Sequence, residues 1–169
     1  MNYKENITSK KIIVIGSPGS GKSFVSSTLS KKLNIPIFYL DKLYWKENWV
    51  AVPRDQFIAI QQDILKKDSY IIDGNYQSTL ELRFKNASTI IFLDIDKNVC
   101  FEAVKGRMGQ KREDFPNYLE EELDDAFVHS ILHFHEDSRP FIVEMIDKYS
   151  EKNIIVLKNR DEVNEFLKD

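Results

Sequence analysis

The sequence predicts an α/β fold, with a parallel sheet of five strands flanked by helices, as a single domain over residues 1–169. Three observations indicate this fold. Short apolar runs rich in β-branched residues recur along the chain, helical patterns lie between them, and a glycine-rich loop directly follows the first run. Because both faces of each run are apolar, we expect a sheet that is covered on both sides.

The five predicted strands share a short length and a continuous apolar character, which are typical of buried parallel strands. They are residues 11–15, 37–40, 70–73, 89–94 and 153–157. The predicted helices lie between or after them, at about 21–33, 54–67, 97–107, 118–135, 137–149 and 160–168. A further short helix opens near Ser78.

Helix start signals support several of these boundaries. Pro53 suits a first helical position, and Ser78 with Glu81 matches a capping box. Asp96 is a candidate N-cap for the helix at 97–107, and Asn159 for the last helix.

Composition narrows the class of protein. The chain is 42% hydrophobic and 30% charged with a net charge of −3, which is ordinary for a globular protein and gives no basic field for nucleic acid or membrane. Cys100 is the only cysteine, so no internal disulfide can form, and this suits a reducing compartment. The N-terminus has no apolar signal region, and no apolar run reaches membrane-spanning length. We therefore expect a cytoplasmic protein with small-molecule ligands, and nucleic acid is not expected as a direct ligand.

The glycine-rich loop is the strongest functional signal. "GSPGSGKS" matches G-x-x-x-x-G-K-[ST] between a predicted strand and a predicted helix. Backbone N–H groups in such a loop cradle phosphates, the lysine reaches the β- and γ-phosphates, and the final hydroxyl ligates Mg²⁺. The predicted ATP site comprises Gly16, Ser17, Pro18, Gly19, Ser20, Gly21, Lys22 and Ser23.

Four segments carry a wider resemblance: "GSPGSGKS", "LDKLYWKENW", "IIDGNY" and the arginine-bearing residues 105–114. With them the chain resembles the adenylate-kinase-like P-loop kinases, and more narrowly the family called DNA topology modulation protein, FlaR-related. The resemblance implies strand order 2-3-1-4-5, an acceptor-binding region at about 41–67, a lid at about 105–116, and ATP with Mg²⁺.

The chain departs from that pattern at one motif. Adenylate kinases have D-G-F-P-R where this chain has "DGNYQ", so the arginine that grips a nucleoside monophosphate is missing. Arg83 is a candidate replacement from another position. Asp41 is similar to the aspartate of shikimate- and gluconate-type kinases, which meets an acceptor hydroxyl.

Two aspartates end neighbouring predicted strands, at the sheet edge where α/β proteins bind ligands. Asp73 is predicted to hold Mg²⁺ together with Ser23, and a turn cap before Gly74 is the alternative. Asp41 is predicted to accept the proton of the acceptor or to hold its hydroxyl, with a plain helix cap as the alternative.

Aromatic residues crowd the segment after the second strand. Tyr44, Trp45 and Trp49 are predicted to line the acceptor pocket, where a ring face suits a planar base or a sugar. Filling the core is the alternative, since tryptophans bury large areas wherever they lie. The other predicted acceptor-site residues are Gly74, Asn75 and Tyr76, with Arg83.

The basic segment around residues 105–112 is predicted to be the lid, with Arg107 and Arg112 stabilising charge on the transferred phosphoryl group. Gly106 and Gly109 would let it move, and Arg139 is a weaker candidate for the same role. The acids within 113–125 are expected on a solvated helix face.

Three histidines and the cysteine could in principle bind a metal or act as a nucleophile, but we expect them to have structural roles. His129, His133 and His135 are expected to be helix residues rather than metal ligands, and Cys100 to be a core residue.

Two functions follow from this pattern. The first is a kinase that transfers the γ-phosphoryl group of ATP to a small-molecule or nucleotide acceptor near Asp41. The alternative is a regulatory ATP-binding or ATPase module, related to DNA topology, with little phosphotransfer. An aspartate after the second strand and a basic lid favour the kinase, because a regulatory switch needs neither.

Overall fold

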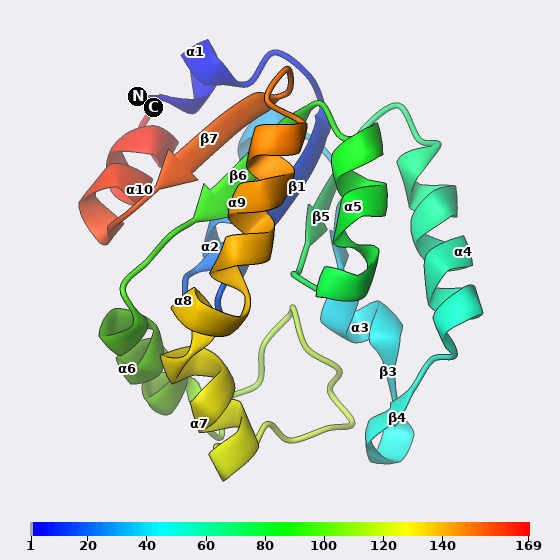
Figure 1. Ribbon diagram of the computed structural model, residues 1–169, viewed down its shortest axis with the longest axis vertical. Coiled ribbons are helices and arrows are strands. Elements are labelled where there is room, and N and C mark those ends of the chain that lie inside the picture. The colour runs from blue at the N-terminus through cyan, green and yellow to red at the C-terminus, as the bar shows by residue number, and fades with distance from the viewer. Residues whose placement is uncertain (1) are drawn as a thin grey trace.

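The computed structural model describes residues 2–169 (Figure 1). Its main sheet contains β1 (Lys11–Gly16), β2 (Ile37–Tyr39), β5 (Tyr70–Asp73), β6 (Thr89–Leu93) and β7 (Asn153–Leu157). All pairings in this sheet are parallel, and its order is β2-β5-β1-β6-β7. In chain order this is 2-3-1-4-5, so the predicted fold and strand order are confirmed.

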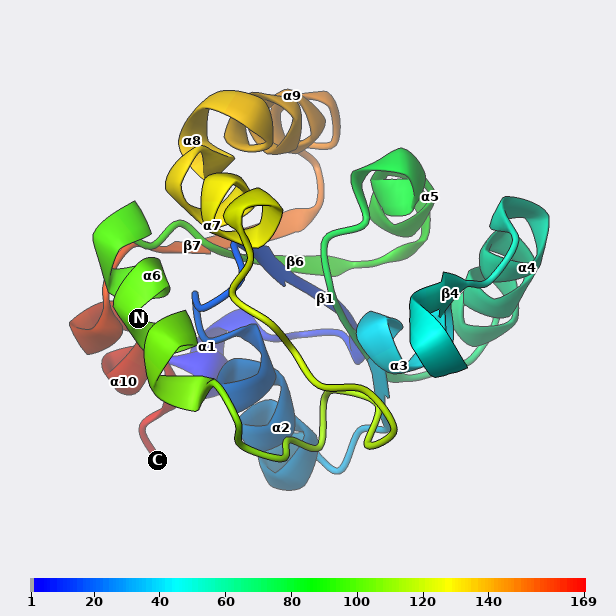
Figure 2. The ribbon, with the colours of Figure 1, turned by 90° about the horizontal axis from the view of Figure 1, so that it is seen from below.

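Helices cover both faces of the sheet, as the end-on view in Figure 2 shows. One face packs against α1 (Tyr3–Asn6), α2 (Lys22–Leu33), α6 (Lys97–Arg107) and α10 (Arg160–Leu167). The other packs against α4 (Arg54–Leu65), α5 (Gln77–Asn86), α8 (Phe134–Asp137) and α9 (Arg139–Lys148). Alternate residues of β1 feed the two cores: Ile12 and Val14 face the first, and Ile13 and Ile15 the second.

The remaining elements are short and lie at the carboxyl edge of the sheet or beside it. They are α3 (Leu40–Tyr44), β3 (Trp45–Lys46), a 3₁₀ turn (Glu47–Trp49), β4 (Val50–Ala51) and α7 (Asp125–Leu132). The two termini meet on one side of the molecule (Figure 1), where the Tyr3 hydroxyl donates to an Asp169 carboxylate oxygen at 3.2 Å.

Two of the predicted helix caps are confirmed. The Asp96 carboxylate accepts from the backbone N–H groups of Asn98 and Val99, and the Asn159 side chain accepts from that of Glu162.

Two other predicted starts are wrong. Pro53 is the N-cap of α4 rather than its first helical residue. The capping box at Ser78 does not form, because α5 begins one residue earlier, at Gln77. Glu81 instead accepts hydrogen bonds from the Lys148 ammonium at the end of α9 and from the hydroxyl of its C-cap residue, Tyr149.

The predicted helix at 118–135 is also wrong in its first half. Residues 118–124 have no helical structure, and α7 starts at Asp125 with Asp124 as its N-cap. A second break at His133 separates α7 from α8. Most acids of this stretch are exposed, as predicted, but they lie on an irregular segment rather than on a helix. Glu121 is an exception: only 16% of its side chain is exposed, and it pairs with Arg107 and Arg112.

Within the part of the chain that the structure describes, no helix is both long and apolar enough to cross a membrane.

Candidate active site

A cavity of about 700 Å³ opens at the carboxyl edge of the sheet. Three parts of the chain line it: the glycine-rich loop after β1, the ends of β2 and β5 with the residues that follow them, and the segment between α6 and α7. The lining includes Lys22, Ser23, Asp41, Trp45, Trp49, Asp73, Gly74, Asn75, Tyr76, Arg107 and Arg112, all of which are predicted site residues. The topology thus brings together chemistry-bearing residues that are up to 90 positions apart in sequence.

The loop of Gly16–Ser23 requires its glycines. Gly19 has φ +80° and lies against α6, so that a Cβ atom there would come within 2.2 Å of the Cys100 carbonyl oxygen. Only glycine allows both this backbone conformation and this close packing. Cys100, buried as expected for a core residue, therefore forms part of the floor beneath the loop.

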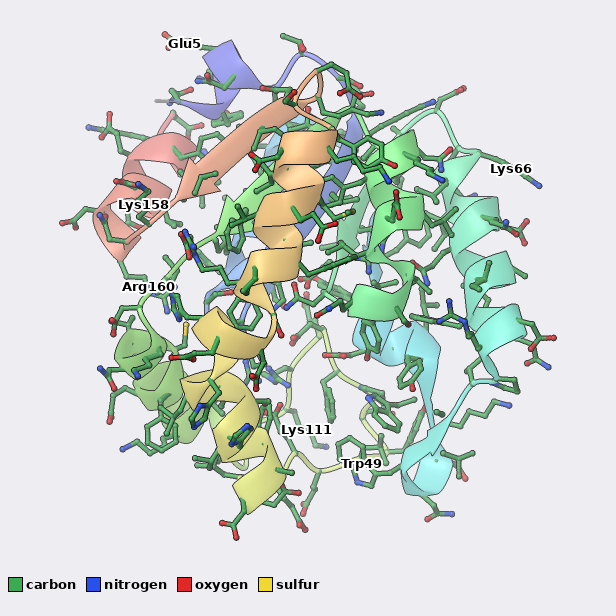
Figure 3. All side chains as sticks on the ribbon, in the orientation of Figure 1. Glu5, Trp49, Lys66, Lys111, Lys158 and Arg160 are labelled. Carbon is green, nitrogen blue, oxygen red and sulfur yellow. The ribbon has the colours of Figure 1, made fainter. Side chains whose placement is uncertain are left out.

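The loop is also fixed by side chains from distant elements. The Asn75 side-chain oxygen accepts from the backbone N–H of Gly16 at 2.9 Å. On its other side, Arg160 of α10 donates to the carbonyl oxygens of Gly19, at 2.9 Å, and of Ser20. Arg160 lies beside α6 in Figure 3. Arg160 could not be predicted, because no local pattern in the sequence indicates which residue of the last helix meets the loop.

Lys22 opens α2 and turns back over the loop. Its ammonium donates to the carbonyl oxygens of Gly16 and Ser17 at 3.1 and 2.9 Å. Burial lowers the pKa of Lys22, and the charges of Asp73 and Asp41 oppose that shift. The cation is thereby held above the place where loop and helix N-terminus favour a phosphate.

Ser23 and Asp73 lie together beside Lys22. The Ser23 hydroxyl donates to an Asp73 carboxylate oxygen at 3.0 Å. Burial raises the pKa of Asp73 to about 6, although Lys22 and the Ser23 hydroxyl pull it down. A hydroxyl and one carboxylate beside a phosphate cradle are a donor set that suits Mg²⁺, which takes few protein ligands and completes its shell with water and phosphate oxygens. The residues therefore fit the predicted metal.

The raised pKa of Asp73 predicts how stability and Mg²⁺ binding should change with pH. The folded, ligand-free protein holds this proton more tightly than the unfolded chain does, so the contribution of Asp73 to stability is present at low pH and is lost as pH rises through about 6. Mg²⁺ binds the ionised carboxylate of Asp73 and not the protonated acid. We therefore expect the extra thermal stabilisation by Mg²⁺·ADP over ADP alone to shrink below about pH 6. Asp73→Asn should remove the increment at every pH, and a full increment in that variant would contradict this assignment.

Asp41 sits in the first turn of α3, directly after β2. The Tyr76 hydroxyl donates to its Oδ1 atom. Burial raises the pKa of Asp41, and the Tyr76 hydrogen bond and Lys22 oppose the shift. The carboxylate faces the cavity and lies close enough to Lys22 to affect its pKa. Asp41 can therefore contact a group that reaches the phosphate cradle.

The aromatic segment divides between the cavity and the core. The rings of Trp45 and Trp49 line the cavity, with centroids 5.3 Å apart, and the Trp49 ring is 5.6 Å from that of Phe115. In Figure 3, Trp49 lies beside the irregular segment that precedes α7. Tyr44 does not line the cavity. Its ring packs at 5.0 Å from Phe57 of α4, behind the pocket wall.

Arg83 does not line the cavity either, which corrects its predicted contact with the acceptor. It is fully buried and donates to the backbone carbonyl oxygens of Gly74, at 2.6 Å, of Asn75, and of Tyr76, at 3.0 Å. It therefore fixes the turn that carries two lining side chains, Asn75 and Tyr76.

This role predicts a stability effect. Arg83→Met should lower the free energy of unfolding by about 3 kcal/mol, because one buried and two partly buried carbonyl oxygens lose their donor. Arg54→Met is a matched control, since Arg54 donates only a long hydrogen bond to the Ser78 carbonyl oxygen at an exposed position. Chemical denaturation of both variants measures the difference, and equal stability would contradict the role of Arg83.

The predicted lid arginines both reach the cavity and both are ion-paired. Arg107 donates through Nε and Nη2 to the two carboxylate oxygens of Glu121, at 2.9 and 2.8 Å. Arg112 lies 3.4 Å from oxygens of Asp114 and of Glu121. Gly106 is inside α6, whereas Gly109 has φ +75° in the loop that follows. Asp114 and Glu121 were missed because the sequence pattern put the acids on a helix.

Arg139 and the histidines lie elsewhere. Arg139 donates to both carboxylate oxygens of Asp94 at 2.9 Å and does not line the cavity. His129 and His133 stack with ring centroids 4.1 Å apart, and His129 and His135 each lie near an aspartate. Among residues 2–169 no three His, Cys, Asp or Glu side chains are arranged to hold a metal ion.

The order of the sheet and the phosphate loop at its carboxyl edge define a P-loop fold of the nucleotide-kinase type. Comparison with known proteins agrees. The chain is 29% identical over 111 residues to the shikimate kinase of Aquifex aeolicus, a match that spans 56% of this chain and 66% of that relative. No family model matches the chain.

Solved structures of small-molecule kinases share the fold. The crystal structure of the Aquifex aeolicus shikimate kinase has a TM-score of 0.52 at 21% identity, over 92% of this chain and 90% of that one. A gluconokinase from Sinorhizobium meliloti has a TM-score of 0.57 at 16% identity, over 99% and 89%. A shikimate kinase from Acinetobacter baumannii in complex with shikimate has a TM-score of 0.59 at 13% identity, over 95% and 90%. These likenesses show the fold, and the narrower FlaR-related resemblance stays a prediction.

Proposed function

We propose that this protein is an ATP-dependent kinase that transfers the γ-phosphoryl group to a hydroxyl group of a small molecule held near Asp41. One observation carries the proposal: the phosphate-binding Lys22, the Ser23–Asp73 pair and Asp41 face a single cavity. The printed activities of the similar proteins, shikimate kinase and gluconokinase, support the same class of reaction.

The donor half of the site follows from the loop. The backbone N–H groups of Gly16–Ser23 and the N-terminus of α2 bind the phosphates, and the Lys22 ammonium leaves the loop carbonyls for phosphate oxygens. Ser23 and Asp73 would hold Mg²⁺, which when bound neutralises charge on the β- and γ-phosphates. Arg107 and Arg112 would meet the charge that the transferred group carries in the transition state.

The acceptor half supplies the nucleophile. The acceptor hydroxyl oxygen attacks the γ-phosphorus; the new O–P bond forms while the bond from that phosphorus to the β,γ-bridging oxygen breaks, and ADP leaves with the bond's electron pair. The hydroxyl proton passes to the Asp41 carboxylate, which the Tyr76 hydroxyl orients. Burial, which raises the pKa of Asp41, makes it a stronger base than a solvated aspartate.

The lid assignment predicts a change in rate rather than in binding. Arg107→Ala should lower kcat by about 10²-fold and weaken ATP binding less, because the guanidinium meets charge that develops in the transition state. Lys105→Ala is the control, since Lys105 lies on the same helix, contacts Glu102 and the Phe101 ring, and does not line the cavity. Normal kcat in Arg107→Ala with the true acceptor would contradict the assignment.

The proposed function is tested by a screen of acceptors. Nucleosides, sugars, polyols, amino alcohols and hydroxy acids are each added with Mg²⁺·ATP, and ADP release is measured. Strong stimulation by one class, with formation of its phosphate ester, is expected. Slow ADP release that no acceptor changes would favour the regulatory ATPase instead.

A further inference from the structure

The cavity is lined by more carboxylates than cationic side chains. Among residues 2–169, its lining includes three cationic side chains: Lys22, Arg107 and Arg112. It includes six carboxylates: Asp41, Asp73, Asp114, Glu121, Glu122 and Asp124. The bound Mg²⁺·ATP of the proposed reaction adds further negative charge. An acceptor therefore enters a cavity whose formal charge is negative before and after the donor binds.

The three cations are already engaged. Lys22 lies in the phosphate loop, where ATP would take its charge. Arg107 is held by both oxygens of Glu121, and Arg112 lies between Glu121 and Asp114. If the two arginines turned to phosphate, as the proposed function requires, Glu121 and Asp114 would lose these partners while still lining the cavity.

Arg83, the remaining candidate for binding an acidic acceptor, is unavailable. It is fully buried, and its guanidinium donates to three backbone carbonyl oxygens behind the cavity wall. In the described part of the chain, the cavity thus lacks a cation that is free to bind a carboxylate or phosphate on the acceptor.

Carboxylates also converge around the reacting position. Asp114, from the segment before α7, lines the same cavity as Asp41 and Asp73, so that a third carboxylate joins the two at the sheet edge. In the proposed reaction Asp41 accepts the hydroxyl proton, and Asp73 would hold Mg²⁺. Asp114 is left for the part of the acceptor that does not react.

The wall beside these carboxylates is aromatic. Trp45, Trp49 and Phe115 line the cavity, and Trp49 remains 44% exposed. Tryptophan faces attract ammonium groups, and a nearby carboxylate adds a separate Coulomb attraction. The guanidinium of Arg112 already lies 5.2 Å from the centre of the Phe115 ring, which shows that this wall accepts a cation.

We propose that the acceptor is a hydroxyl compound that also carries a protonated amine, and that it has neither a carboxylate nor a phosphate. The hydroxyl lies at Asp41 and is phosphorylated, while the ammonium lies between Asp114 and the Trp45–Trp49–Phe115 wall and takes no part in the bond changes. This inference rests on the proposed kinase function, whose donor site it leaves unaltered.

The test compares ring compounds of similar size and different charge: benzylamine, benzyl alcohol and benzoate. Each is titrated into the full chain saturated with Mg²⁺·ADP, at neutral pH, and the indole N–H signals of the two tryptophans are followed by NMR. We expect benzylamine to bind at least about tenfold more tightly than benzoate, because each nearby carboxylate attracts one and repels the other. Benzyl alcohol should fall between them.

Two variants locate the effect. Asp114→Asn should reduce the preference for the amine several-fold, and Glu120→Gln, which removes the same charge from an exposed residue outside the cavity, should leave it unchanged. Benzoate binding as tightly as benzylamine, no detectable binding of the amine, or an unchanged preference in Asp114→Asn would overturn the inference. Titration of Mg²⁺·ADP alone separates the two claims: if the nucleotide fails to bind, the kinase proposal fails, and if it binds without amine preference, only the acceptor class is wrong.

Discussion

Lys22→Ala is expected to abolish measurable turnover and to weaken Mg²⁺·ATP binding by about 10²-fold or more. The loop N–H groups remain in the variant, but the cation that bridges the β- and γ-phosphates is lost. The fold should persist, because the Lys22 ammonium donates only to two loop carbonyl oxygens. Calorimetric titration with a non-hydrolysable ATP analogue measures the effect.

Lys31→Ala is the matched control for that variant. Lys31 lies on the same helix, at an exposed position away from the cavity, so its removal changes the net charge equally. Wild-type affinity and turnover in a folded Lys22→Ala protein would contradict the phosphate site itself. A loss of equal size in Lys31→Ala would assign the effect to net charge rather than to the site.

Asp41→Asn has the second largest expected effect, and it separates acceptor chemistry from donor binding. The amide keeps the size of the side chain and its acceptor oxygen for the Tyr76 hydroxyl, but it cannot take a proton. Phosphoryl transfer should fall by about 10²- to 10⁴-fold, while the affinity for Mg²⁺·ATP stays close to wild type.

The exposed Asp55 of α4 supplies the control, and Asp55→Asn should leave both quantities unchanged. If ATP affinity falls as far as transfer does in Asp41→Asn, the carboxylate belongs to the metal site beside Asp73. If transfer is unaffected, Asp41 does not take the proton; a helix-cap role is not the alternative, because the N-cap of α3 is Tyr39.

The sheet and the phosphate site could be predicted because their signals are local. The apolar residues of β1 and β6 form unbroken runs, and each of them is buried. Likewise, the conformations that Gly19 and Gly21 adopt, with φ of +80° and +98°, are those that the motif's glycines exist to allow. Such patterns need no knowledge of distant residues.

The segment between α6 and α7 could not be predicted in the same way. Its acids have the spacing and composition of an exposed helix, and nothing nearby in sequence shows that Glu121 pairs with Arg107, fourteen residues earlier. Ion pairs across a cavity override weak local propensity. Arg83 was misjudged for a related reason: a buried arginine is rare, and its partners are backbone carbonyl oxygens, which carry no sequence signature.

The aromatic segment that contains Trp45 and Trp49 could be predicted only in part. Its position after β2 indicated the acceptor side of the site, and both rings line the cavity. Tyr44, one residue earlier, faces Phe57 instead. The side-chain direction depends on the short helix α3 and the turn into β3, whose boundaries the apolar pattern does not define.

The most direct test of the central claim follows the phosphoryl group itself. Phosphorus NMR of the protein with Mg²⁺·ATP and an acceptor that stimulates ADP release should show a phosphate monoester resonance growing in step with ADP. In Asp41→Asn the ester signal should nearly vanish while the bound-nucleotide signals persist. Inorganic phosphate as the sole product with every acceptor tried would contradict the kinase and would leave an ATPase at this site.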